Sequence, residues 1–412
     1  MSGTDTVTLP LSGLKVVDLG IITAGAGCSA LLGDFGAEVL KVESGAYPDP
    51  FRFWSMGSVS NPGSSLDGSA PFNAMNRNKL GVCLDLKTAE GRDAVLRLVA
   101  SADIVVENFR RGVLDRLGLA ITDLLQVNPR IVLVSITSQG DTGPERSYGS
   151  YGSTLEAISG LMSVSGYDAE TPRASGADVN YPDQHGALLA AGLTLAAVMA
   201  ARRTGQGRHL VLSQREMVTG LIGEDCLDYA INGRIARPLG NRHSRFVPHG
   251  VFPCAGEDNW IAIAITDDAA WTALADEIGG TVMAPELARA EGRRGHEDEI
   301  ETSIADWTAA QDKHELARRL QAVGVAAAPV LNPAERHAEP HFVERGFFHT
   351  IEHPVSGKQI HRGTPFRLKG VAAASRRAPL LGEHTRAVLA GAGFSAAELA
   401  ELDAKGITRN TR

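Results

Sequence analysis

An aspartate stands directly before the longest Ala/Leu-rich run of the sequence. Asp183 lies in "NYPDQHG", and the run that follows, "ALLAAGLTLAAVMAARRTGQG", has the composition of a buried helix closed by glycine. Asp is a favoured N-cap residue because its carboxylate accepts hydrogen bonds from the free amides of the first turn. A carboxylate can also act as a nucleophile that forms acyl intermediates. The local sequence leaves both interpretations of Asp183 open, a helix cap and a catalyst.

A glycine-rich turn follows the first expected strand, "GLKVVDLG". Gly25, Gly27 and Ala30 match G-x-G-x-x-A, and Glu43 closes the next strand. These are parts of a dinucleotide-binding fingerprint, although here the glycines begin several residues after the strand. Three interpretations follow: an NAD or FAD site, close packing of a small-residue helix, or another phosphate-bearing ligand at the same sheet edge.

Cysteine and histidine spacing indicates no metal site. Cys28, Cys83, Cys226 and Cys254 are widely separated and form no CxxC pair, so we expect buried free thiols rather than a disulfide framework. The 12 histidines show no HExxH or comparable ligand spacing.

Charge and hydropathy exclude two kinds of partner. The chain has 412 residues and a net charge of −8, whereas a nucleic-acid-binding protein needs a clustered basic surface. We see no apolar run of the ~18 to 20 residues that cross a bilayer, and "MSGTDTVTLP" lacks the features of a signal peptide. We expect a cytoplasmic protein that binds neither nucleic acid nor a membrane.

Strand and helix patterns alternate over the first half of the chain, which predicts an α/β fold with a mostly parallel sheet. Ser213 and Glu216 have the spacing of a capping box at the start of a further helix. We expect a large domain from 1–229, a smaller α+β domain from 230–330, and a segment from 331–412 that returns to the large domain.

Several stretches together resemble the class III CoA-transferases of the formyl-CoA transferase and carnitine CoA-transferase type. They include "PLSGLKVVDLGIITAGAGCSALLGDFGAEVLKVE", "NRNKLGVCLDLKTAEGRDAVLRLVASADIVVENFRRGVLDRLGL", "NPRIVLVSITSQGDTGP" and "YPDQHGALLAAGLTLAAVMAARRTGQGRHLVLSQRE". The resemblance implies a Rossmann-like large domain, a small inserted domain, and a homodimer of two interlocked chains. It also implies coenzyme A at the sheet edge where a dinucleotide was considered.

The resemblance implies roles for individual residues. Those expected to line the CoA channel or to contact the nucleotide end are Ile22, Thr23, Ala24, Asn76 to Lys79, Asn108, Phe109 and Arg116. Lys79 and Arg116 suit phosphates by charge, the alternative being solvated surface charges. Gln139 falls near the thioester site, where its amide could donate to a developing oxyanion.

By position, Asp183 matches the family's nucleophile, with Asp178 as its rival. Such a carboxylate moves CoA from an acyl-CoA donor to a carboxylic acid acceptor through an aspartyl anhydride and an enzyme-CoA thioester, with no tightly bound cofactor. An α-methylacyl-CoA racemase is the alternative within the family, but the expected "GHD-x-NY" reads "SYGSYGSTLEAISG" here. An NAD-dependent oxidoreductase and a non-catalytic acyl-CoA-binding module are the alternatives outside it.

A basic loop stands where relatives carry a run of glycines. This chain reads "NRHSRFVPHG", and we expect Arg242, His243 and Arg245 to bind the acceptor acid. Guanidinium groups hold carboxylates in bidentate fashion, so a C4 or C5 dicarboxylic acid fits. An exposed basic loop without a ligand is the alternative.

Overall fold

The computed structural model describes residues 9–54, 66–176, 181–369, 371, 373 and 375–409. Within them the chain divides into two units. Unit 1 comprises 1–161, 175–227 and 343–412, and unit 2 comprises 162–174 and 228–342. We had assigned 162–174 to the large domain, but these residues cluster with unit 2. Unit 1 resumes at Val343, twelve positions after the expected return at 331.

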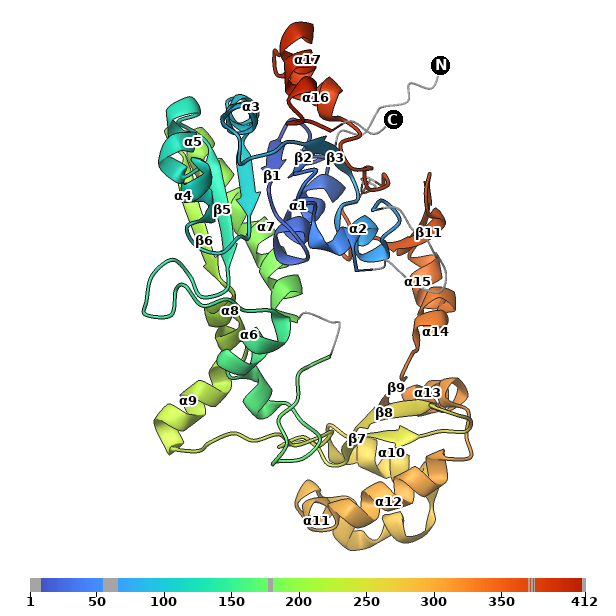
Figure 1. Ribbon diagram of the computed structural model, residues 1–412. Coiled ribbons are helices and arrows are strands. Elements are labelled where there is room, and N and C mark those ends of the chain that lie inside the picture. Colours follow the sequence, from blue (N-terminus) through green and yellow to red (C-terminus); the bar gives the residue numbers. More distant parts are fainter. Residues whose placement is uncertain are drawn as a thin grey trace. The chain divides into compact units, whose positions relative to one another are not determined.

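A six-stranded, wholly parallel sheet forms the centre of unit 1, which confirms the α/β class (Figure 1). Its order is β3-β2-β1-β4-β5-β6, the order of a Rossmann sheet. The strands are β1 (Lys15–Asp18), β2 (Glu38–Glu43), β3 (Lys79–Cys83), β4 (Ile104–Glu107), β5 (Val132–Thr137) and β6 (Arg208–Ser213). Most of their residues are buried, as a parallel sheet covered on both faces requires.

Two apolar clusters cover the two faces of the sheet. On one face lie α1 (Ala24–Asp34) and α7 (Tyr181–Thr204). On the other lie α3 (Ala89–Val99), α4 (Val113–Leu117) and α5 (Ile121–Val127). The C-terminal helices α16 (Thr385–Gly391) and α17 (Ala396–Ala404) pack into this second cluster through Leu389, Leu399 and Leu402. The end of the chain therefore completes a core that its beginning starts.

The remaining elements of unit 1 are short. They are α2 (Ala70–Met75), α6 (Gly152–Ile158), α8 (Gln214–Leu221) and the antiparallel hairpin of β10 (Phe348–His353) and β11 (Gly357–Arg362). α8 begins with the expected cap, because the Ser213 side chain accepts a hydrogen bond from the Glu216 amide. α9 (Gly223–Asn232) runs from unit 1 into unit 2 and buries none of its residues. It carries Cys226, so the expectation that this thiol is buried is wrong.

Unit 2 contains a three-stranded antiparallel sheet of order β7-β8-β9. Its strands are β7 (His249–Pro253), β8 (Trp260–Ala264) and β9 (Ala326–Pro329). Its helices are α10 (Asp268–Ile278), α11 (Ala290–Gly295), α12 (Glu297–Thr308), α13 (Lys313–Ala322) and α14 (Pro333–Ala338), followed by α15 (Pro340–Glu344), which runs into unit 1. One core cluster joins this sheet to α10, α12 and α13.

By length and composition alone α7 could cross a membrane, which the sequence analysis did not anticipate. In the structure its small residues, Ala187, Ala190 and Ala201 among them, are buried in the cluster that α7 shares with α1 and the sheet. We therefore interpret α7 as a core helix. It ends before Gly205, whose φ of 72° is the left-handed conformation expected for a glycine after a helix.

Candidate active site

The strand order reverses direction between β1 and β4. The chain leaves these two neighbouring strands toward opposite halves of the sheet, and ligands of such sheets bind at this point, beyond the carboxyl ends of the strands. The turn after β1 meets the residue after β4 here. Asn108 Oδ1 accepts a hydrogen bond from the Ile21 amide at 2.8 Å, and its Nδ2 donates to the Ile21 carbonyl at 3.1 Å.

The turn between β1 and α1 is tightly folded. A Cβ atom on Gly20 would lie only 2.7 Å from Gly25 Cα, so glycine is required at this close approach. Ile22 is half-buried, whereas Thr23 and Ala24 are each 2% exposed. Of the three residues expected to line the CoA channel, Ile22 therefore presents the most surface in the isolated chain.

Lys79 is buried, and its ammonium is bound within the protein. It is 3% exposed, which rules out a solvated surface charge. Its ammonium donates to Asp18 Oδ2 at 2.8 Å, to the Ala26 carbonyl at 2.8 Å and to Asn76 Oδ1 at 3.0 Å. All three donors are thus engaged, and we interpret Lys79 and the fully buried Asn76 as supports of α1 rather than as phosphate contacts.

Phe109 and Arg116 follow strand β4 in the sequence. Phe109 is half-buried against the core, and its amide donates to Glu107 Oε2 at 2.7 Å. Arg116 is exposed near the C-terminus of α4. Burial raises the pKa of the Glu107 carboxyl to about 7. Among the basic residues predicted to contact the nucleotide, Arg116 is therefore the one whose side chain reaches solvent.

Asp183 is the third residue of α7, so the interpretation of it as the N-cap is wrong. Tyr181 and Pro182 are already helical, as the preference of proline for the first turn allows. Asp183 Oδ1 accepts a hydrogen bond from Gln214 Nε2 at 2.6 Å. Burial raises the pKa of Asp183, and the bond from Gln214 offsets part of this effect by favouring the ionised form. Asp178 lies outside the described residues.

The first turns of α7 and α1 lie against each other. A Cβ atom on Gly27 would stand 3.1 Å from Ala187 Cβ, one helical turn beyond Asp183. Gly186 lies beside the Gln214 side chain, where a Cβ atom would make ordinary contact at 3.6 Å. The N-terminal end of α7, which carries Asp183, therefore packs close to the start of α1.

His185 turns toward the start of its own helix. Its ring lies 3.9 Å from the Tyr181 ring, centroid to centroid, and its Nδ1 is 3.1 Å from the Tyr181 carbonyl oxygen. The structure thus gives His185 partners other than Asp183. This arrangement offers no support for a His/Asp pair that exchanges a proton.

Gln139 and Gln214 follow the neighbouring strands β5 and β6, whose ends pair Thr137 with Ser213. Gln139 Nε2 donates to Ser150 Oγ at 2.8 Å, which leaves a second N–H on the same nitrogen. Its Oε1 is buried without a hydrogen-bond partner in the part of the chain that the structure describes. Gln139 is therefore a polar side chain with unused hydrogen-bonding capacity at the same sheet edge.

In unit 2, the three residues predicted to bind the acceptor acid, Arg242, His243 and Arg245, have different surroundings. Arg242 donates to Glu301 at 2.9 and 2.7 Å and also pairs with Asp298, so its charge is already neutralised by α12. His243 stacks on Phe246 at 4.4 Å, and its Nδ1 accepts from the amides of Arg245 and Phe246. The prediction that Arg242 and His243 bind substrate therefore loses its support. Arg245 is the exposed cation of the three without a carboxylate partner among the described residues.

The dinucleotide interpretation finds no support either. Glu43, the acid that would bind a ribose, is buried and forms a bidentate pair with Arg52 at 2.8 and 2.7 Å. Gly25 and Gly27 instead serve close packing, the second of the three interpretations. Among the described residues, no three His, Cys, Asp or Glu side chains gather as a metal site.

Comparison with known proteins decides the family. The model of CoA-transferase family III matches residues 11–385. The chain belongs to this family. The transferase is 31% identical to the succinyl-CoA–D-citramalate CoA-transferase of Chloroflexus aurantiacus, over 97% of this chain and 98% of that protein. It is 31% identical to the succinate–glutarate CoA-transferase of Agrobacterium fabrum, over 92% of this chain and 95% of that protein.

A solved structure and a longer relative extend the comparison. The crystal structure of a CAIB/BAIF family protein from Brucella suis has a TM-score of 0.84 and 30% identity, over 93% of the transferase and 100% of that chain. A Mycobacterium tuberculosis protein named as a CoA-transferase is 35% identical over 91% of this chain, which spans 47% of that protein's length. These findings favour the transferase over the racemase and oxidoreductase alternatives.

Sequence reasoning missed three polar residues near the site of the transferase. Gln214 follows directly on strand β6, and its place at the carboxyl edge was a usable signal. Lys41 interrupts the apolar strand "EVLKVE" and is fully buried, as is its partner Asp49. A charge inside a strand that is covered on both faces needs a buried partner, and this could have prompted a search for Asp49.

Proposed function

We propose that this transferase carries CoA from an acyl-CoA donor to a carboxylic acid with Asp183 as the nucleophile. The observation that carries the proposal is the placement of Asp183 in the first turn of α7, with one oxygen held by Gln214. Oδ2 has no hydrogen-bond partner among the described residues. A carboxylate oriented through one oxygen presents the other for attack.

The reaction needs no acid–base catalyst. Asp183 Oδ2 attacks the thioester carbonyl carbon, the C–S bond breaks, and a mixed anhydride and CoA thiolate form. The thiolate attacks the aspartyl carbonyl carbon, which releases the donor acid and leaves an enzyme-CoA thioester. The acceptor carboxylate then attacks that thioester, and the expelled thiolate takes the acyl group from the second anhydride. Asp183 returns as a carboxylate, and the energy of the thioester is conserved throughout.

Groups near the carboxyl edge can stabilise the negative oxygens of this path. The amides of the first turn of α7, which have no partners within a helix, and the second N–H of Gln139 are donors of the required kind. One oxyanion donor typically contributes about 3 kcal/mol. We place CoA along the β1–α1 turn, with Ile22 beside the pantetheine arm and Asn108, Phe109 and Arg116 toward the nucleotide.

For substrates we propose succinyl-CoA as donor and a C4 or C5 dicarboxylic acid as acceptor. The relatives named above act, by their names, on succinyl-CoA or succinate together with citramalate or glutarate. Arg245 is the side chain of the basic loop that is free to hold a second carboxylate. A panel of mono- and dicarboxylic acids against succinyl-CoA and acetyl-CoA tests this. Equal turnover of monocarboxylates, unchanged in Arg245→Ala, would contradict it.

We further propose that the transferase is an interlocked homodimer. Large apolar side chains stand exposed on α7, at the end of α8 and in α9: Leu188, Leu189, Leu193, Met199, Leu221 and Leu227. An interlocked pair would bury far more than the ~1,600 Å² of a standard interface, so dissociation should coincide with unfolding. Light scattering after size exclusion at submicromolar concentration tests this, and a folded monomer would exclude it.

The nucleophile is tested by trapping. The enzyme is incubated with succinyl-CoA, quenched, treated with hydroxylamine and mapped by mass spectrometry. We expect the adduct on Asp183, and we expect Asp183→Ala to lose on the order of 10³-fold or more in kcat. An adduct on another carboxylate, Asp178 for instance, or near-normal turnover of the variant, would refute the assignment.

A further inference from the structure

The turn that receives CoA in the proposed function contains a backbone conformation that its residue disfavours. Ile22 has a φ of 59°, in the left-handed region. A β-branched residue is a true outlier there, at a cost of about 1–3 kcal/mol. Such a conformation persists only where the surrounding structure holds it. The contacts on either side of Ile22 therefore decide the shape of the turn.

A buried carboxylate holds the Ile22 amide. Asp49 Oδ1 and Oδ2 accept from it at 3.2 and 3.3 Å. The Lys41 ammonium lies 2.9 Å from Asp49 Oδ2 and also donates to the Gly20 carbonyl. Both charged side chains are fully buried. The ion pair thus forms hydrogen bonds to the backbone on both sides of Ile21, and Asn108 forms hydrogen bonds to Ile21 itself.

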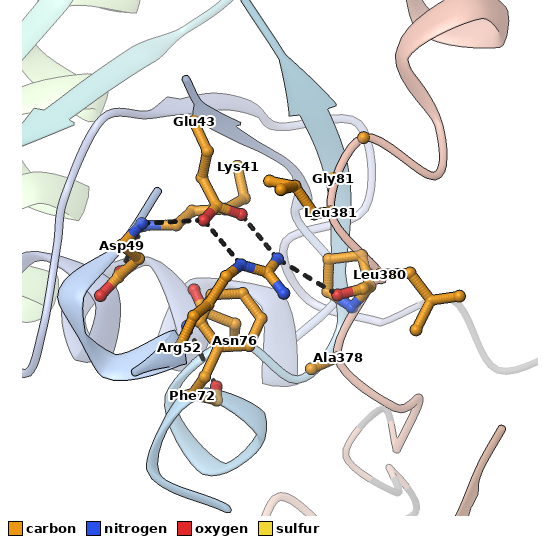
Figure 2. A network of polar contacts seen from close by, with 12 residues as sticks. Lys41, Glu43, Asp49, Arg52, Phe72, Asn76, Gly81, Ala378, Leu380 and Leu381 are labelled. Atoms are coloured by element: carbon orange, nitrogen blue, oxygen red, sulfur yellow. Dashed lines mark hydrogen bonds and ion pairs between the residues drawn. The ribbon is translucent and has the colours of Figure 1, made fainter. Parts of the chain in front are cut away.

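The position of Asp49 is fixed in turn by its neighbours (Figure 2). Its Oδ1 accepts from the Phe51 amide at 3.0 Å, and its own amide donates to Glu43 Oε1 at 3.0 Å. Glu43 is paired with Arg52, and Figure 2 shows the two side chains meeting beside Asp49. Burial alone would raise the pKa of Asp49, but Lys41 and the amides of Phe51 and Ile22 together more than offset this, so the pKa lies below its usual range. Asp49 is therefore ionised at neutral pH.

Stability alone is a weak reason for such a pair. Replacing a buried ion pair by well-packed apolar residues is often neutral or stabilising, because desolvation cancels much of the attraction. Here the hydrogen bonds that the pair makes beyond itself go largely to the backbone of 20–22. What the pair specifies is the path of this turn.

We propose that Asp49 is a positioning residue for coenzyme A, which holds the β1–α1 turn in the left-handed conformation that the CoA thioester requires. The inference rests on the proposed function, since it takes Ile22 as part of the CoA channel. Asp49 acts through the Ile22 amide and touches no reacting atom. Its loss should weaken the binding of CoA and leave the binding of the acceptor acid unchanged.

The test compares two buried carboxylates. Asp49→Asn keeps the side-chain volume but removes the charge that Lys41 and the Ile22 amide face. Asp34→Asn is the matched control, because Asp34 is also buried and paired, with Arg77 Nε at 2.9 Å, but lies at the far end of α1. Arg77 was expected near the nucleotide, but it is 4% exposed in this pair and is not among the residues that we place against CoA. We expect Asp49→Asn to raise the Kd of CoA and the KM of succinyl-CoA about tenfold, the scale of one charge-assisted hydrogen bond. The acceptor KM should stay within twofold, and Asp34→Asn should lower Tm without changing the Kd of CoA.

A double-mutant cycle separates positioning from general weakening. Glycine adopts a positive φ without strain, so a turn with Ile22→Gly needs less support. The cost of Asp49→Asn in CoA affinity should therefore be smaller in the Ile22→Gly background. An unchanged Kd of CoA in Asp49→Asn, an equal loss in Asp34→Asn, or full additivity in the cycle would overturn the proposal.

Two further measurements keep the result decisive. If Asp49→Asn does not fold, Lys41→Gln removes the other charge of the ion pair and should give the same selective loss of CoA affinity. Unaltered affinity in that variant would overturn the proposal. A wild-type protein that does not bind CoA at all would instead refute the proposed function.

Discussion

The hydrogen bond from Gln214 to Asp183 makes a prediction about the pH dependence of transfer. Gln214→Met conserves length and volume but removes the donor that lies 2.6 Å from Asp183 Oδ1. Asp183 must be ionised to attack, and burial already raises its pKa. Without the donor the ionised form loses a stabilising partner, so the pKa rises further. The acid limb of the rate profile should move to higher pH.

The size of the effect follows from the contact. A hydrogen bond to a charged group contributes about 1.5–3 kcal/mol, and a tenfold change in an ionisation equilibrium is about 1.4 kcal/mol. The acid limb of kcat/KM for succinyl-CoA should therefore move upward by about one to two pH units. Above the limb the rate should also fall below wild type, because Gln214 orients Asp183 as well. The shift of the limb, and not the height of the plateau, therefore measures the effect on the pKa.

The assay is kcat/KM from pH 5 to pH 9, with CoA esters quantified by chromatography. Gln139→Met is the matched control, since Gln139 ends the neighbouring strand and its amide donates to Ser150 rather than to Asp183. It should lower the rate at all pH values and leave the acid limb in place. A Gln214→Met profile that is lowered uniformly, or whose acid limb stays or moves down, would refute the role given to Gln214.

Three further predictions concern charge and stability. Burial raises the pKa of Glu107 from 4.5 to about 7, so the folded state binds this proton more tightly than the unfolded state does. The contribution of Glu107 to the free energy of unfolding is therefore fully present below pH 4.5, falls as the pH rises toward 7, and is constant above that pH. Glu107→Gln should remove about 3 kcal/mol of this dependence in urea unfolding, and an unchanged slope would contradict it. Asp183→Asn should raise stability at pH 7, because it removes a carboxylate that burial penalises; a lower Tm would show that the carboxylate has stabilising partners. Arg242→Ala should leave transfer intact and cost at most about 1 kcal/mol, since its partners are surface carboxylates; a raised acceptor KM would restore Arg242 to the substrate site.

The sheet of unit 1 was largely predictable, because its strands are buried on both faces and read as short apolar runs between glycines. Their alternation with helices gave the α/β class. The residues at the carboxyl edge were also within reach, since parallel strands end together and Asn108, Gln139 and Ser213 each follow a strand or close one. The N-cap interpretation of Asp183 failed because α7 already begins at Tyr181.

Side-chain roles were predicted less well, because partners come from distant parts of the chain. Lys79 was expected to face a ligand, but Asp18, 61 positions away, binds it in the core. Arg242 was expected to hold a substrate, but Glu301, 59 positions away on α12, holds it instead. Local sequence carries no information about either pairing. Lys41 was the exception, since a charge amid apolar strand residues already requires a buried counter-charge.

In the proposed mechanism the Asp183 carboxylate must be both oriented and ionised. Full burial of Asp183 would hold it protonated, and full exposure would cost it its orientation. Its half-buried place between these limits is set by the bond from Gln214 and by the packing of α7 on α1, where Gly27 lies close to Ala187. The β1–α1 turn that Asp49 and Lys41 hold leads directly into α1. In the proposed mechanism, the ion pair that positions CoA and the nucleophilic carboxylate therefore belong to one packed unit, so a shift of α1 would misplace both groups together.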